Sequence, residues 1–511
     1  MNLTRRHFIR NTAALGAATG LGISPTISAQ GTTLNVRMRR DIAVLDPGYM
    51  VGGTEVSTQA AVMPRLARQV THGDTLIWIP SDYVSSVVQT DPTHIDFTLK
   101  PGFMWTNGFG ELTSADVKYS FERMLESEWS GDWESLETVE VKDKYSGTIV
   151  LNRAFAPFAT ITLAGSTGIM VCKAATEEVG GKYAAEIPAT CGPYINEWTP
   201  KQRTVFKLNP DWAGPKPYFD QINYIVVDED KVAELAYEAG EVELTEIAAN
   251  TVLRYAKNPP ENSTVVASNS LQYAWVGLNT EHPKLKDPRV RKAIQHAVDV
   301  KSILQGAYNG VTHPSYGPVP PGLVGKRSET NYAYDPAKAK ALLSEAGVSG
   351  LELSLRTMNA QDRMLAAQIV QANLLAVGIK LEIIPLEAGP FWDMGQESKG
   401  DVWKDLELWI MRYGASPDPY SVMQWFVRSQ VGIWNWERWS SDEFEDLYAK
   451  GLVETDVDAR HGIYIRMQEI MEDTGGYVWL THEPESFVHS NDLVPEIGPS
   501  GNLDFRNFKR V

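Results

Sequence analysis

The chain has 511 residues, of which 43% are hydrophobic, and its formal net charge is −17 at pH 7. A chain of this length is expected to form two or three domains, and its apolar content is sufficient for a large core. The acidic balance argues against nucleic acid and anionic membrane surfaces as partners.

The first thirty residues have the pattern of an export signal. Arg5 and Arg6 form a twin-arginine motif, a Gly/Ala-rich apolar segment covers residues 12–23, and small residues lead up to Ala29. This combination predicts a signal peptide over residues 1–29 that is cleaved after Ala29. The apolar run is too short to span a bilayer. We therefore expect the mature protein in the periplasm, without membrane insertion.

Several helices are marked by the residues at their N-termini. Thr113-Ser114-Ala115-Asp116 is typical of a capping box. Asp287-Pro288 and Asp335-Pro336 each place an aspartate cap before a proline in the first turn, and Gly347 is expected to end the helix that follows the second pair. A further helix is predicted over about residues 361–378, with a buried face formed by Leu365, Ile369, Ala372 and Leu375.

Predicted strands flank this last helix. Residues 351–355 precede it, and residues 379–384 and 406–411 follow it. The order strand, helix, strand predicts a βαβ unit in a sheet covered on both faces. Residues 34–100 have more strand and turn character.

The sequence shows few features that would support catalysis or metal binding. Motifs for a nucleophilic serine, a zinc protease, a phosphate loop and a dinucleotide site are absent. The nine histidines form no ligand-spaced cluster. Two cysteines, Cys172 and Cys191, either pair in an oxidising compartment or remain separate buried thiols. No catalytic residue, metal or cofactor is predicted.

Several sequence blocks occur together in the order and spacing of one family. They are Asp96-Phe97-Thr98-Leu99-Lys100-Pro101-Gly102 with residues 112–117, Cys191-Gly192-Pro193-Tyr194 ahead of Asn209-Pro210-Asp211-Trp212, Leu278-Asn279 ahead of residues 287–294, Tyr334-Asp335-Pro336 with Gly347, Gly378-Ile379, and Pro417-Asp418-Pro419. In these blocks the chain resembles the extracellular solute-binding proteins of ABC importers. The class concerned, often called family 5, binds peptides, opines, nickel complexes and oligosaccharides.

The resemblance implies an α/β, bilobal periplasmic-binding-protein fold with three domains and with the ligand in the cleft between the lobes. Domain I would comprise residues 30–70, 186–275 and 479–511. Domain II would comprise residues 71–185, and domain III residues 276–478, so that two chain crossings form the hinge. The implied partners are a small-molecule solute and the permease subunits of an ABC transporter, and we expect a monomer.

The resemblance also suggests where a ligand binds. Peptide-binding members hold the peptide's ammonium group with an aspartate in a loop after a domain III strand, and alignment on Asp418-Pro419 places Ala415 at that position. Arg412 introduces a cation that suits a carboxylate or phosphate group of a ligand. The equal alternative is that Arg412 forms a structural ion pair within the protein. The candidate ligand-binding residues are Tyr49, Trp275, Asn279, Asn359, Arg412, Tyr413, Gly414, Ala415, Asn435 and Trp436.

The leading interpretation is a periplasmic component of an ABC transporter. It captures a small peptide-like, opine-like or other carboxylate-bearing solute and delivers it to the permease without catalysing a reaction. Seven tryptophans lie between Trp392 and Trp439; most are expected in the core, but flat aromatic faces suit sugar rings, so an oligosaccharide is the alternative ligand. An exported glycoside hydrolase is the alternative from another class, which would need two carboxylates across one cleft.

Overall fold

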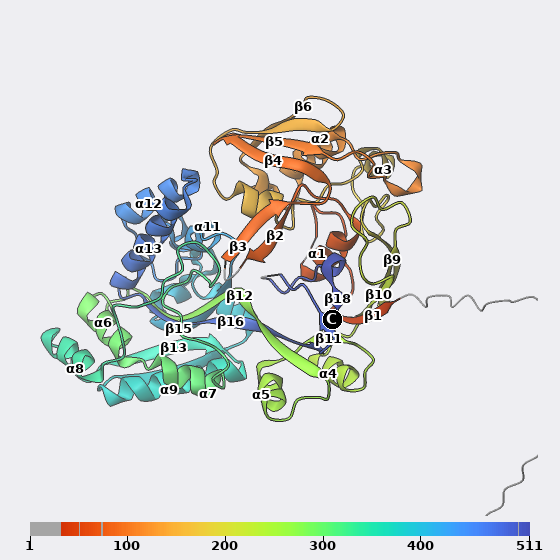
Figure 1. Ribbon diagram of the computed structural model, residues 1–511. Coiled ribbons are helices and arrows are strands. Elements are labelled where there is room, and N and C mark those ends of the chain that lie inside the picture. Colours follow the sequence, from red (N-terminus) through yellow and green to blue (C-terminus); the bar gives the residue numbers. More distant parts are fainter. Residues whose placement is uncertain (1–31, 51, 73–74, 499) are drawn as a thin grey trace, which may run out of the picture.

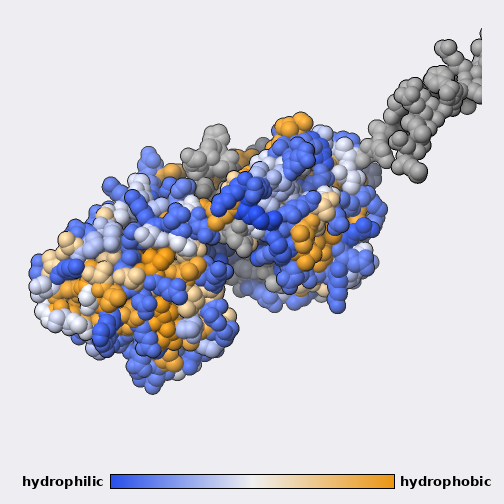
Figure 2. Space-filling view, turned by 90° about the horizontal axis from the view of Figure 1, so that it is seen from below, coloured by the Kyte–Doolittle hydropathy of each residue, from blue (hydrophilic) through white to orange (hydrophobic). Residues whose placement is uncertain are grey.

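The computed structural model describes residues 32–50, 52–72, 75–498 and 500–511. The predicted signal peptide and its cleavage site lie outside these residues. Two lobes are joined by the long strands β12 (Ser263–Leu278) and β16 (Tyr477–Ser490) (Figure 1). We call residues 32–262 and 491–511 lobe 1 and residues 279–476 lobe 2, with β12 and β16 running through both. Figure 2 shows a notch between the two lobes.

One ten-stranded sheet continues through both lobes. Its order is β14-β13-β15-β12-β16-β11-β1-β10-β9-β8. The bounds of its other strands are β1 (Thr33–Met38), β8 (Tyr194–Thr199), β9 (Arg203–Leu208), β10 (Gln221–Val226), β11 (Leu244–Glu246), β13 (Glu352–Met358), β14 (Lys380–Leu386) and β15 (Leu408–Gly414). The antiparallel pairing of β12 with β16 is interrupted between Ser268 and Gln272. This irregularity lies where the two strands pass from one lobe to the other.

Lobe 1 contains a second, four-stranded sheet with its own core. The sheet order is β4-β5-β7-β6, and a separate hairpin pairs β2 with β3. Cys172 and Cys191 are free and buried in the core of this part. The elements are α1 (Gly53–Val62), β2 (Ala67–His72), β3 (Thr75–Pro80), β4 (Val84–Asp91), β5 (His94–Leu99), α2 (Ser114–Glu122), β6 (Leu136–Val141), β7 (Ser146–Leu151), α3 (Lys173–Glu178), α4 (Asp230–Glu238), α5 (Ala249–Lys257), β17 (Leu493–Val494) and β18 (Lys509–Arg510).

In lobe 2 the sheet is buried on both faces. Alternate residues of a strand point to opposite faces: Ala274, Val276 and Leu278 of β12 enter one core, whereas Tyr273 and Trp275 enter the other. The first core is covered by α6 (Pro288–Ala297), α7 (Val300–Ala307), α8 (Pro336–Glu345) and α9 (Gln361–Ala376); the second, rich in tryptophan, lies among α10 (Ala388–Asp393), α11 (Tyr420–Met423), α12 (Asp442–Val453) and α13 (Val457–Asp473). Among the described residues, no helix is both long enough and apolar enough to cross a membrane.

The predicted βαβ unit and the predicted helix starts are confirmed. Strands β13 and β14 are parallel and are joined through α9. The backbone N–H of Thr113 donates to Asp116 Oδ2 at 2.9 Å, as a capping box requires. Asp287 accepts from the backbone N–H of Arg289, and Asp335 from that of Lys338.

The predicted buried face of α9 is wrong by about one residue along the helix. Leu365 and Leu375 are 36% and 62% exposed and Ala372 is exposed, whereas Ile369 is half-buried and packs against the core as predicted. The core of lobe 2 instead takes up Arg363, Ala366, Ala367, Val370 and Leu374. Apolar residues occur on more than one side of this helix, so periodicity alone did not decide which side faces the sheet.

Gly277 in β12 is the site of our first testable prediction, because a side chain there would collide with Trp409. A Cβ atom on Gly277 would lie 2.3 Å from Cε2 of Trp409 in the neighbouring strand β15. Gly277→Ala is expected to lower the free energy of unfolding by about 1–3 kcal/mol, the usual cost of overpacking a core. Urea unfolding followed by circular dichroism measures this change.

The matched control is Gly462→Ala in α13. Gly462 is exposed, and its added Cβ would meet no atom within 4 Å. This substitution is expected to raise the free energy of unfolding by up to about 1 kcal/mol, since alanine favours a helix more than glycine does. Equal effects of the two substitutions would contradict the packing argument.

Candidate functional site

A cavity of about 690 Å³ lies between the two lobes. Lobe 1 contributes residues from α1, from the β2–β3 hairpin, from the region 129–166 and from the C-terminal segments 495–498 and 500–504. Lobe 2 contributes Ala415, Ser416 and Pro417 from the loop after β15. We call this space the inter-lobe cavity. Its volume is within the range of small-molecule sites, and both lobes form its wall.

The two lobes are in contact near this cavity. The backbone N–H of Ala156 in lobe 1 donates to the carbonyl of Leu452 in lobe 2 at 2.7 Å. The rings of Phe155 and Tyr420 meet edge to face, with their centroids 5.4 Å apart. The two lobes therefore contact each other beside the cavity. Such contacts are expected where two lobes close over the space between them.

Charged side chains from lobe 1 line part of the inter-lobe cavity. Arg68 pairs with Glu496 at 3.4 Å. Asp504 accepts from Nε of Arg506 at 2.8 Å. Arg65 is only 7% exposed, and its Nε and Nη2 atoms have no hydrogen-bond partner among the described residues. Burial, reinforced by the neighbouring Arg506, lowers the pKa of Arg65 to about 10, so this residue stays charged at neutral pH.

An acidic side chain lines the same cavity. Asp132 belongs to lobe 1, and its Oδ2 accepts a hydrogen bond from the hydroxyl of Thr167 at 3.2 Å. Burial raises the pKa of Asp132, and the bond from Thr167 opposes that shift. The cavity wall thus carries a buried arginine, Arg65, and a half-buried acid, Asp132.

Of the predicted ligand-binding residues, Ala415 lines the inter-lobe cavity. Tyr413 and Gly414 precede it, but the hydroxyl of Tyr413 donates to the carbonyl of Trp434 at 3.1 Å and Gly414 is exposed. Tyr49 lies against Lys182, whose ammonium nitrogen is 3.3 Å from the ring centroid. Asn359 is exposed. The structure therefore does not bring these residues together around one ligand.

Four other predicted residues are buried inside lobe 2. Trp275, Asn279, Asn435 and Trp436 are each at most 2% exposed. Their side-chain nitrogens donate to protein oxygens: Trp275 to Glu437 (2.7 Å), Asn279 to the carbonyl of Leu406 (3.0 Å), Asn435 to that of Phe426 (3.0 Å) and Trp436 to that of Ile433 (2.9 Å). In this structure these four side chains therefore pack the lobe interior. Since their donors are already paired, none is left for a solute.

In this structure Arg412 forms an ion pair within the protein, which was the alternative to a ligand contact. Its Nη1 lies 3.1 Å from Oε2 of Glu483 in β16, and its side chain is 52% exposed. Glu483 also pairs with Arg363 at 2.6 Å. Arg412 is not part of the wall of the inter-lobe cavity.

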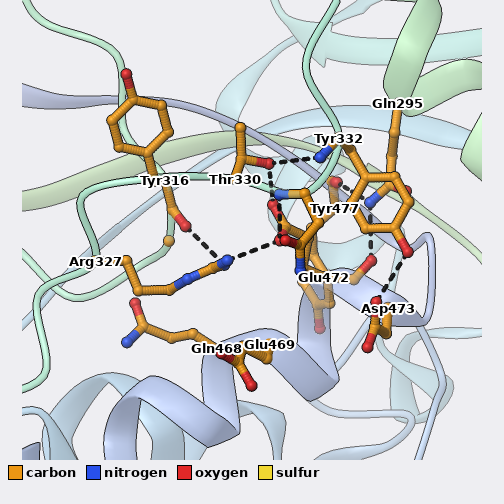
Figure 3. A network of polar contacts seen from close by, with 12 residues as sticks. Gln295, Tyr316, Arg327, Thr330, Tyr332, Gln468, Glu469, Glu472, Asp473 and Tyr477 are labelled. Carbon is orange, nitrogen blue, oxygen red and sulfur yellow. Dashed lines mark hydrogen bonds and ion pairs between the residues drawn. The ribbon is translucent and has the colours of Figure 1, made fainter.

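A second cavity, of about 580 Å³, is lined by lobe 2 and by the first residues of β16. Beside it, Arg327 donates to the carbonyl of Tyr316 and pairs with Glu472, both at 2.9 Å, and the hydroxyl of Thr330 donates to Glu472 (Figure 3). This network holds the long segment between α7 and α8 against α13. A larger cavity, of about 980 Å³, is lined by residues between 311 and 328, by Val457 and His461, and by parts of β12 and β16. Neither of these two cavities has a described lobe 1 residue in its wall, so lobe closure would not enclose a ligand there. The inter-lobe cavity, which both lobes line, is therefore the candidate site.

Sequence reasoning missed the lobe 1 part of this site. Arg65, Asp132 and the segments 495–498 and 500–504 were not predicted, since they are far apart in the sequence and belong to no motif. One signal was available for Arg65: it interrupts the apolar stretch Val62-Met63-Pro64-Arg65-Leu66-Ala67. A charge in such a stretch needs a partner or a function.

Comparison with known proteins identifies the family. The model for bacterial extracellular solute-binding proteins, family 5, matches residues 62–433. Di/tripeptide-binding protein 2 of Pseudomonas aeruginosa (strain UCBPP-PA14) is 25% identical, with 90% of this chain and 91% of that protein covered. The glutathione-binding protein GsiB of Salmonella typhi is 25% identical, with 94% of each covered.

Solved structures share the fold. HbpA2 from Haemophilus parasuis superposes with a TM-score of 0.82 at 20% identity, covering 94% of this chain and 99% of that one. DppA from Helicobacter pylori in complex with the peptide STSA gives a TM-score of 0.71 at 24% identity, covering 94% and 98%. The α/β, two-lobed fold expected from the sequence is confirmed. The chain belongs to the bacterial extracellular solute-binding proteins, family 5.

Proposed function

We propose that this protein is the periplasmic solute-binding component of an ABC importer and that its solute is a short peptide or a similar carboxylate-bearing compound. The observation that carries the proposal is the family match over residues 62–433, together with a cavity walled by both lobes. Relatives named for dipeptides, tripeptides and glutathione support a peptide-like solute. The buried Arg65 and the half-buried Asp132 in the cavity wall suit a zwitterion.

The proposal includes the three-domain division with domain III over residues 276–478, and β12 and β16 as the hinge. The irregular pairing between Ser268 and Gln272 supports this position, because hinges are a few residues that absorb changes in backbone angles. A solute that contacts both lobes would favour the closed state, which the permease would then engage. Binding and release leave the solute unchanged, so no reaction is proposed.

A ligand screen on the mature protein tests this function. Dipeptides, tripeptides and glutathione are expected to raise the melting temperature, since a ligand at 100 times its Kd stabilises the native state by about 2.7 kcal/mol. Small-angle scattering should show a slightly smaller radius of gyration with such a ligand. Stabilisation by oligosaccharides alone, or hydrolysis of a glycoside, would contradict the proposal.

A further inference from the structure

Arg65 is held at a fixed place in the wall of the inter-lobe cavity. It lies between α1 and β2, its backbone forms an isolated bridge with Ile169, and its carbonyl accepts a hydrogen bond from the hydroxyl of Ser81. The side chain lines the cavity and is more than nine-tenths buried. Its position is thus set by the fold of lobe 1 rather than by a mobile surface loop.

The neighbouring acids are committed to other arginines. Both oxygens of Asp504 accept from Arg506, at 2.8 Å from Nε and 2.5 Å from Nη2. Glu496 pairs with Arg68. In the described part of the chain, the guanidinium of Arg65 forms no ion pair and no side-chain hydrogen bond, and Nη1 of Arg506 is also without a partner.

An unpaired guanidinium at this depth is unfavourable. Moving a charged group out of water costs far more free energy than moving a neutral polar group. This cost is recovered only when an opposite charge and further hydrogen bonds surround the buried charge. Arg506 adds like-charge repulsion, which attraction by the nearby Asp504 opposes. A carboxylate in the cavity would offset both the cost of burying the charge and the repulsion from Arg506. A guanidinium matches a carboxylate well because it can donate two parallel hydrogen bonds.

From this geometry we infer that Arg65 receives a carboxylate group of the solute at the lobe 1 wall of the inter-lobe cavity. The inference rests on the proposed function and deepens it, since it names the chemical group that is recognised and the lobe that recognises it. It also fixes the solute's direction: the carboxylate end lies toward lobe 1, and the other end lies toward the loop after β15. Arg412 is not needed for this recognition, because Glu483 already pairs with it.

The test compares free and amidated peptides. Probes are a library of di- and tripeptides with free C-terminal carboxylates and the same library as C-terminal carboxamides, measured by calorimetry on the mature protein. The wild type is expected to bind the acids at least about tenfold more tightly than the carboxamides. Arg65→Gln should weaken acid binding by roughly ten- to a hundredfold, the worth of one desolvated charge-assisted interaction, and leave carboxamide binding within about twofold.

Two further variants separate recognition from folding. Arg65→Lys should restore part of the preference for acids, because it keeps the charge but not the fork of donors. Arg254→Gln is the matched control: Arg254 lies in α5 of lobe 1, outside the wall of the inter-lobe cavity, and pairs with Glu238 at 2.6 Å, so this variant should keep the wild-type ratio within about threefold. Melting of the ligand-free variants shows whether each one folds.

The outcomes distinguish this inference from the function on which it rests. Equal affinity of the wild type for acids and carboxamides would overturn the role of Arg65 and leave peptide binding intact. An unchanged acid preference in Arg65→Gln, with lowered stability of the ligand-free protein, would also overturn it and make Arg65 structural. Failure of the wild type to bind either library would overturn the proposed peptide function itself, and the inference with it.

Discussion

Arg363→Met is expected to lower the free energy of unfolding by about 3–5 kcal/mol, the usual cost of leaving a buried charge without its partner. Arg363 in α9 is 8% exposed and pairs with Glu483 at 2.6 Å; it also donates to the hydroxyl of Tyr308, which in turn donates to Glu483. Burial opposes ionisation of Glu483, but Arg363 and Arg412 outweigh it and lower the pKa of this carboxyl. Without Arg363, the largely buried carboxylate of Glu483 would keep the hydroxyl of Tyr308 but would have only the exposed Arg412 as a cationic partner. Urea unfolding at pH 7 measures the loss.

Arg412→Met is the matched control on the same carboxylate. Its side chain is 52% exposed, so its removal is expected to cost less than about 1 kcal/mol. The double variant Arg363→Met with Glu483→Met should recover much of the lost stability, because replacing both charges leaves none unpaired. If Arg363→Met and Arg412→Met had equal effects, the difference in burial would not govern this network. If Arg412→Met instead weakened solute binding without changing stability, the sequence-based prediction for Arg412 would stand.

Glu437→Gln is expected to stabilise the protein increasingly as the pH rises from 5 to 8. Glu437 is 1% exposed inside the tryptophan-rich core of lobe 2, where it accepts from Nε1 of Trp275 at 2.7 Å. Burial raises the pKa of Glu437 to about 8. Glutamine keeps the acceptor for Trp275 and the side-chain size but cannot ionise.

The direction of this pH dependence follows from how many protons the native and unfolded states bind. Below about pH 4.5 the carboxyl is protonated in both states, so Glu437 adds no pH dependence. Between about pH 4.5 and 8 the unfolded chain releases this proton and the native state retains it, so stability falls as the pH rises. One such group changes stability by at most about 1.4 kcal/mol per pH unit, or about 4 kcal/mol between pH 5 and 8.

The measured quantity is the difference in unfolding free energy between the variant and the wild type at pH 5, 6, 7 and 8. This difference should grow with pH, whereas Glu241→Gln, at an exposed glutamate, should show a difference that hardly changes. A constant difference for Glu437→Gln would show that Glu437 is ionised in the folded protein.

Local features of the sequence determined much of the fold. The caps at Thr113, Asp287 and Asp335 and the βαβ unit around α9 depend on residues close together in the chain, and the structure has them where they were predicted. The order and spacing of the family blocks likewise indicated the two-lobed architecture, because spacing along a chain is preserved when a fold is shared.

Tertiary structure alone decided which side chains meet. Trp275 and Trp436 were assigned to a ligand because aromatic rings suit binding sites, yet the sheet of lobe 2 is covered on both faces and takes them into its core. The face of α9 was misjudged for a similar reason, since only the packed sheet selects among several apolar sides.

The cavity wall shows the same division most clearly. Arg65, Asp132 and Ala415 come from three distant parts of the sequence and line one space between the lobes. The sequence by itself determined the charge of each residue and the family of the whole chain. Whether a charge is paired depends on which other segments fold against it: Arg412 pairs with Glu483 across β12, whereas among the described residues Arg65 forms no ion pair. The pairing is set by packing between segments that are distant in the sequence, and local residue spacing does not predict it.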